Sequence, residues 1–117
     1  MRVGRQQSSV GELAASTKGR VGMAAYLVAD VDVTDPAGFE EYRKGLPATL
    51  AAYGGRFLTK PGAIEPVEGK WAPKRLAIVE FDSVAHLKAW LESPEYRALQ
   101  QVRHRTAHTN AVIVDGL

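Results

Sequence analysis

The distribution of apolar residues along the chain predicts four β-strands. Residues 24–33 are apolar at nearly every position, so both faces of this extended segment are apolar. Three further segments have the length and composition of strands: residues 56–60, 75–81 and 110–116. In the first, third and last of these four segments, apolar residues occupy both alternating sets of positions, so these strands are expected to be apolar on both sides.

Between the strands, large apolar residues recur every three or four positions, which is the period of a helix face. The longest such stripe is Phe39, Tyr42, Leu46, Leu50 and Tyr53. Asp35 and Pro36 fit the N-cap and the first position of this helix, and a glycine after Tyr53 fits its C-terminal cap. Gly45 and Pro47 interrupt the stripe, so a kink is expected near Leu46.

Two shorter helices are predicted after the third strand, over residues 84–92 and from Pro94 to about His108, the second with Ser93 as its N-cap. The resulting order, β-α-β-β-α-β, is that of the ferredoxin-like α+β fold, a four-stranded antiparallel sheet with its helices on one face. Such a sheet, apolar on both sides, exposes an apolar face that is typical of an interaction surface. The simplest cover is a second copy packed sheet against sheet, so the sequence predicts a homodimer.

Charge is distributed unevenly along the chain. Residues 1–22 hold four basic side chains and one acidic side chain, whereas residues 23–117 hold 11 basic and 12 acidic ones. The second part is nearly neutral, so we expect no nucleic-acid partner, and no apolar run approaches the roughly 20 residues of a membrane helix.

The first 22 residues contain no aromatic residue and few large aliphatic ones. We therefore expect a flexible basic extension, followed by one folded domain over residues 23–117. Two alternatives are open: a mitochondrial transit peptide, which the arginine and serine content faintly resembles, and a true start at Met23.

Residue types that hold cofactors are scarce. The chain has no cysteine, which excludes disulfides, thiolate metal sites and a cysteine nucleophile and suits a cytoplasmic location. His104 and His108 have the i, i+4 spacing of metal ligands on a helix, but Arg103 and Arg105 beside them oppose a divalent ion. The glycine patterns that bind phosphates are missing. We expect no metal and no cofactor.

Three stretches carry a family resemblance: DPAGFEEYRKGLPATLAAYGGRFL, EGKWAPKRLAIVEFDS and AWLESPEYRALQQVR. Over residues 24–116 the chain closely resembles an uncharacterised family of bacterial dimeric α+β barrel proteins, the domain-of-unknown-function family numbered 1330. The resemblance implies the fold and the dimer but no agreed activity. The wider superfamily includes cofactor-independent monooxygenases, lactone isomerases, haem proteins similar to chlorite dismutase and ligand binders, and the fold does not choose among them.

Glu80 is the first candidate site residue. It shares a strand face with Leu76 and Ile78, and antiparallel pairing brings Arg56 beside it. One interpretation is a structural ion pair. The other is a pocket carboxylate with a raised pKa that acts as an acid or base.

The fourteen residues that join the second and third strands are too many for a tight turn and contain Glu68, Gly69 and Trp71. Trp71 either folds back on its own core or docks on the dimer partner, or else Glu68 and Trp71 line the mouth of a pocket. The specific residues favour a loop that serves the pocket and the interface.

Four residues on the helices complete the candidate set: Tyr42, Trp90, Tyr96 and Arg103. Buried tyrosines need partners for their hydroxyl groups. Arg103 continues the inward stripe of Tyr96 and is suited to bind an anionic group such as a carboxylate, or to pair with Glu80.

Two hypotheses of different classes follow. The first is a dimeric binding module with an apolar pocket between sheet and helices, in which Arg56, Glu80 and Arg103 are the few polar groups. The second is a cofactor-independent monooxygenase or isomerase in which Glu80 abstracts a proton while tyrosine or arginine holds the oxyanion. A purely structural dimer is a third possibility.

Overall fold

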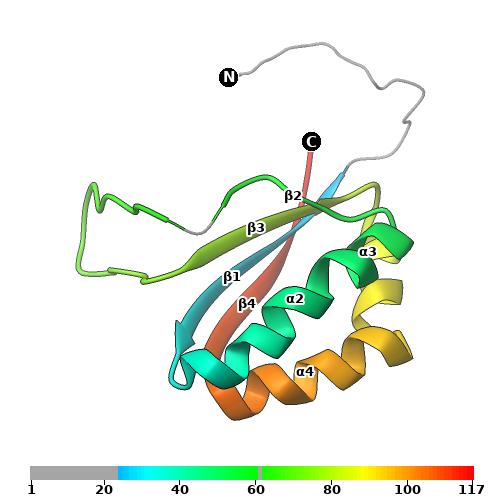
Figure 1. Ribbon diagram of the computed structural model, residues 1–117. Coiled ribbons are helices and arrows are strands. Elements are labelled where there is room, and N and C mark those ends of the chain that lie inside the picture. Colours follow the sequence, from blue (N-terminus) through cyan, green and yellow to red (C-terminus); the bar gives the residue numbers. More distant parts are fainter. Residues whose placement is uncertain (1–23, 61) are drawn as a thin grey trace.

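The computed structural model describes residues 24–60 and 62–117 (Figure 1). The expected extension over residues 1–22 and the alternative start at Met23 lie outside the described residues. The elements are β1 (Ala25–Val33), α2 (Pro36–Ala52), β2 (Arg56–Phe57), β3 (Leu76–Phe81), α3 (Val84–Leu91), α4 (Pro94–Thr106) and β4 (Ala107–Asp115). No helix within the described ranges is both long and apolar enough to cross a membrane.

The strands form one four-stranded antiparallel sheet in the order β2-β3-β1-β4. The three helices of the described residues all lie on one side of it (Figure 1). The predicted ferredoxin-like α+β fold is confirmed. The core lies between sheet and helices, where Phe81, Leu87 and Trp90 are the largest fully buried side chains.

The strand registers assign each residue to one of two faces, because residues paired directly across a ladder point to the same side. Leu27 pairs with Val79 and Ala29 with Ala77 on the side that faces the helices. We call the opposite side the open face; its apolar residues are Tyr26, Val28, Leu76, Ile78, Val112 and Val114. Val112 and Val114 are 58% and 45% exposed.

The predicted helix caps are present. The Asp35 carboxylate accepts a hydrogen bond from the Gly38 N–H, and the Ser93 hydroxyl accepts one from the Tyr96 N–H, at 3.2 Å in both cases. α2 continues through Gly45 and Pro47 as one helix. Gly45 has a packing reason of its own: a Cβ there would lie 2.9 Å from the Leu99 side chain of α4.

Two predicted boundaries are wrong. β2 is only two residues long, although the Leu58 N–H still donates to the Ile78 carbonyl at 2.8 Å. α4 ends at Thr106 and β4 follows without a loop. The Thr106 carbonyl accepts the N–H groups of Thr34 and Asp35, at 2.8 and 3.0 Å, and Ala107 already pairs with Val33. Tertiary pairing therefore ends the helix before His108.

Replacing Gly55 by alanine tests the packing between the α2 terminus and the sheet. A Cβ at Gly55 would lie 2.6 Å from the ring of Phe81, which is fully buried. We expect Gly55→Ala to lower the free energy of unfolding by about 1–3 kcal/mol, the usual cost of overpacking. Gly62→Ala, with nothing within 4 Å of the added methyl group, should change it by less than about 0.5 kcal/mol. Urea denaturation measures both; equal effects would contradict this packing.

Candidate functional site

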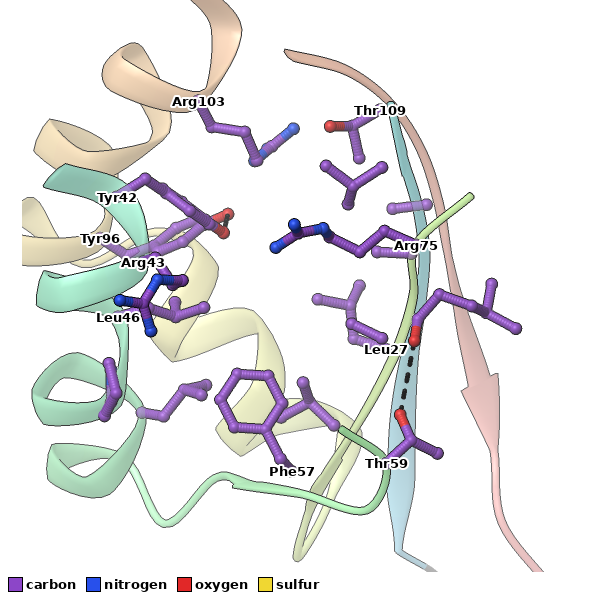
Figure 2. A pocket seen from close by; sticks show the side chains of 18 of the residues that line it. Leu27, Tyr42, Arg43, Leu46, Phe57, Thr59, Arg75, Tyr96, Arg103 and Thr109 are labelled. Atoms are coloured by element: carbon purple, nitrogen blue, oxygen red, sulfur yellow. Dashed lines mark hydrogen bonds between the residues drawn. The ribbon is translucent and has the colours of Figure 1, made fainter. Parts of the chain in front are cut away.

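A cavity of about 340 Å³ lies between the helix-facing side of the sheet and the helices (Figure 2). Its volume is at the lower end of the range of about 300–1,000 Å³ that is typical of ligand pockets. Most of its wall is apolar: β1 contributes Leu27 and Ala29, β3 contributes Val79, and α2 contributes Leu46 and Leu50. The cavity lies within a single chain and is formed by the predicted layers of the fold.

Two tyrosine hydroxyl groups meet at one end of this cavity. The Tyr42 and Tyr96 oxygens are 3.1 Å apart and share a hydrogen bond. The Tyr96 ring lies against the Trp90 ring with 3.9 Å between centroids, and the Trp90 N–H donates to the Thr49 hydroxyl at 3.1 Å. The tyrosine pair is therefore held in place by buried aromatic packing from α2, α3 and α4.

The Tyr42 hydroxyl stays neutral over an unusually wide pH range. Burial is the main cause that raises its pKa well above the ordinary value of a tyrosine, and the Tyr96 hydroxyl raises it further, whereas Arg103 opposes the shift. A neutral hydroxyl donates or accepts a hydrogen bond but is not a base at neutral pH. The pair is suited to hold a ligand rather than to abstract a proton.

Basic side chains line the cavity, but no acidic side chain does among the described residues. The lining includes Arg43, Lys60, Arg75 and Arg103, and no aspartate, glutamate or histidine among the described residues that form the wall. Arg43 donates two hydrogen bonds of 2.8 and 2.7 Å to the Glu40 carboxylate.

Arg75 and Arg103 instead lie over aromatic rings. Their guanidinium carbons are 5.2 Å from the centroid of Phe39 and 5.9 Å from that of Tyr42. In the described part of the chain neither forms an ion pair. A cation over a ring keeps its full charge, so this end of the cavity is positive.

The structure brings four of the sequence-predicted residues together in this cavity: Tyr42, Trp90, Tyr96 and Arg103. It separates Arg56 and Glu80 from them. Arg56 pairs directly with Glu80 across β2 and β3, and the two side chains form the expected ion pair. Since Glu80 follows Val79 on a strand, it points to the open face. The expectation that Arg56 and Glu80 share a pocket with Arg103, or that Glu80 pairs with Arg103, is wrong.

The loop between β2 and β3 extends beyond the sheet (Figure 1). Glu68 and Trp71 do not line the cavity. Trp71 is 61% exposed, and its indole N–H donates to the Asp30 carboxylate of β1 at 2.9 Å. Asp30 lies two residues after Val28 on β1 and therefore also points to the open face, so the loop tryptophan belongs to that side of the sheet.

His104 and His108 do not lie on one helix as the sequence suggested. His104 lies on α4 and His108 on β4, so the helical spacing between them is lost. No group of three metal-binding side chains occurs among the residues that the structure describes.

Sequence reasoning missed Arg75, which points into the cavity beside Arg103 (Figure 2). A signal was present: Arg75 precedes Ala77 and Val79 at the two-residue period of β3 and therefore shares their face.

Comparison with known proteins places the fold but no activity. A family model described as "Domain of unknown function (DUF1330)" matches residues 24–117. No curated protein matches the chain.

Solved structures resemble this chain at low sequence identity. A protein of unknown function from Rhodopseudomonas palustris is 12% identical, with a TM-score of 0.66 over 85% of this chain and 86% of the other. A dimeric ferredoxin-like protein of unknown function from Thermobifida fusca is 19% identical, with a TM-score of 0.56 over 80% and 92%. SnoaB, a cofactor-independent oxygenase from Streptomyces nogalater, is 11% identical, with a TM-score of 0.52 over 80% and 92%. At these identities the likeness shows the fold alone.

Tyr42→Phe tests the buried hydroxyl pair through alkaline stability. In the unfolded chain Tyr42 ionises near its ordinary pKa of about 10, whereas the folded protein keeps it neutral. Its contribution to stability is complete below that pH and is lost above it, at up to about 1.4 kcal/mol per pH unit. The variant should lose about 1 kcal/mol at neutral pH. Above about pH 10 its free energy of unfolding should then fall less steeply than that of the wild type.

Urea denaturation at a series of pH values from about 8 to 11 measures both slopes. Parallel slopes for wild type and variant would contradict the neutral buried hydroxyl.

Proposed function

Because the chain belongs to the DUF1330 family, whose description assigns no function, we propose from the site itself that it binds a small, largely apolar molecule with an anionic group. The observation that carries this proposal is the 340 Å³ cavity with apolar walls and, at one end, Arg75 and Arg103, which form no ion pair within the described residues. Concave, mostly apolar sites with a few convergent polar groups are typical of small-molecule binding.

A binding role fits the residues better than the enzyme alternative does. Abstraction of a proton needs a base within hydrogen-bond reach of the substrate. Glu80 lies on the other side of the sheet, the described wall holds no carboxylate or imidazole, and the raised pKa of Tyr42 keeps that group protonated. A monooxygenase or isomerase that uses a pocket carboxylate therefore has no support from this site.

We also propose that the protein acts as a homodimer through the open face. Six apolar side chains lie on this face, two of them about half exposed, and none of the described helices covers them. Trp71 is fixed beside them by its hydrogen bond to Asp30 and remains exposed. An apolar centre with a large aromatic residue is typical of protein interfaces. The similar protein from Thermobifida fusca is described as dimeric.

Filling the cavity should abolish binding. Ala77 lines the cavity from β3, so the larger side chain of Ala77→Leu would occupy ligand volume. We expect native mass spectrometry of freshly purified wild type to show a retained small molecule, and Ala77→Leu to show little or none. Ala98→Leu, on the exposed surface of α4, is the matched control and should retain the ligand. Equal retention by Ala77→Leu would place the ligand elsewhere.

A charge on the open face should separate the protomers. Val112→Lys would bury an unpaired ammonium group at the interface, which is strongly unfavourable, whereas Ala98→Lys adds the same charge on a helix surface. Light scattering at micromolar concentration should give twice the chain mass for wild type and Ala98→Lys, and the chain mass for Val112→Lys with unchanged helical circular dichroism. A wild-type protein of chain mass would refute the dimer.

A further inference from the structure

We propose that the end of the cavity bounded by Arg75, Arg103 and Thr109 is a carboxylate-binding site, and that the ligand is a monocarboxylic acid with an apolar body. This inference rests on the proposed function and specifies its ligand class. Figure 2 shows the two guanidinium groups, the Thr109 hydroxyl and the two tyrosine hydroxyl groups at the same part of the cavity.

The Thr109 hydroxyl is the most specific indication of a bound ligand at this end of the cavity. Its oxygen is buried and has no hydrogen-bond partner in the described part of the protein. Buried hydroxyl groups are nearly always hydrogen-bonded, because leaving one without a partner is costly. Thr109 faces the cavity from β4, opposite Arg103 of α4 (Figure 2). A ligand oxygen at this point would satisfy the hydroxyl.

The charges of the two arginines indicate which kind of ligand oxygen binds beside Thr109. Arg75 and Arg103 form no ion pair within the described residues, and each guanidinium presents several N–H donors in one plane. Planar donors of this kind bind carboxylates by two parallel hydrogen bonds. A carboxylate would therefore pair with the two guanidinium groups, whereas an uncharged ligand would leave them without an ion pair.

The tyrosine pair adds a further donor. Two hydroxyl hydrogens are present, and the bond between Tyr42 and Tyr96 uses one of them. The other is free to donate to the same oxygen-rich group. At the far end of the cavity the Thr59 hydroxyl is already bonded to the Leu76 carbonyl and the Ile78 N–H. Lys60, which follows Thr59 in the lining, is exposed, whereas Arg75, Arg103 and Thr109 are half-buried. The donors that are shielded from solvent therefore gather at one end, which favours one carboxylate over two.

The volume limits the apolar body. A cavity of about 340 Å³ holds about eleven water volumes of roughly 30 Å³ each, so the ligand has on the order of ten non-hydrogen atoms. The wall between Leu27 and Leu46 is suited to a phenyl ring or a medium-length alkyl chain. 3-Phenylpropionate and octanoate match this size and serve as probes.

The test compares each acid with its own primary amide, which has nearly the same shape and no charge. Isothermal titration calorimetry at pH 7 should show both acids binding wild type at least tenfold more tightly than their amides. Arg103→Gln and Thr109→Val should each reduce this ratio at least threefold. Arg97→Gln removes an exposed arginine of the same helix that does not line the cavity, and should leave the ratio unchanged.

Thr109→Val separates a ligand role from a structural one. Valine keeps the shape and removes the unpartnered hydroxyl, so the melting temperature should be unchanged or higher while affinity for the acids falls. Loss of both stability and affinity would overturn the assignment of Thr109. Equal affinity of wild type for acids and amides would overturn the carboxylate site but not the proposed function. No binding of any probe, with no retained molecule in native mass spectrometry, would overturn both.

Discussion

The two-residue period of β3 is the constraint on which the remaining structure depends. It sends Arg75, Ala77 and Val79 toward the helices and sends Ile78 and Glu80 to the open face. A shift of one residue would exchange these sets completely, because neighbouring side chains of a strand point to opposite sides. The cavity would then hold the carboxylate of Glu80 and lose the guanidinium of Arg75. Direct pairing of Arg56 with Glu80 and the burial of Phe81 favour the observed register.

That register explains why the cavity is electrostatically one-sided. The chain as a whole is close to charge balance, yet the acidic side chains near the site form ion pairs outside the cavity. Glu40 pairs with Arg43 at the surface, and Glu80 pairs with Arg56 of the neighbouring strand on the open face. Arg75 and Arg103 are held over aromatic rings, which position a cation without neutralising it. The result is an apolar chamber with a preorganised positive end, an arrangement that reduces the cost of fixing an anionic ligand.

Much of the fold was predictable because local signals and the tertiary structure agree. The cap residues Asp35 and Ser93 are followed by helices in which each cap accepts the expected N–H. Gly54, which follows the C-cap residue Tyr53, takes a positive φ of 76°, as is common after the end of a helix. The ends of helices and strands were less predictable where tertiary pairing competes with helix propensity. At Thr106, for example, the carbonyl accepts hydrogen bonds from the residues that follow β1. The candidate site was only partly predictable, since helix stripes identify Tyr42, Tyr96 and Arg103 but contain no information about which sheet face lies opposite them.

The sequence by itself determined the order of strands and helices, the helix caps and the partnership of Arg56 with Glu80, because each depends on periodicity and on neighbours in one ladder. Only the tertiary structure decided which residues share the cavity. Arg75, Arg103 and Thr109 come from β3, α4 and β4 and meet through the packing of helices on one side of the sheet. The same packing left Glu80 on the opposite side, because the choice of covered face is made by the whole fold and not by any single strand.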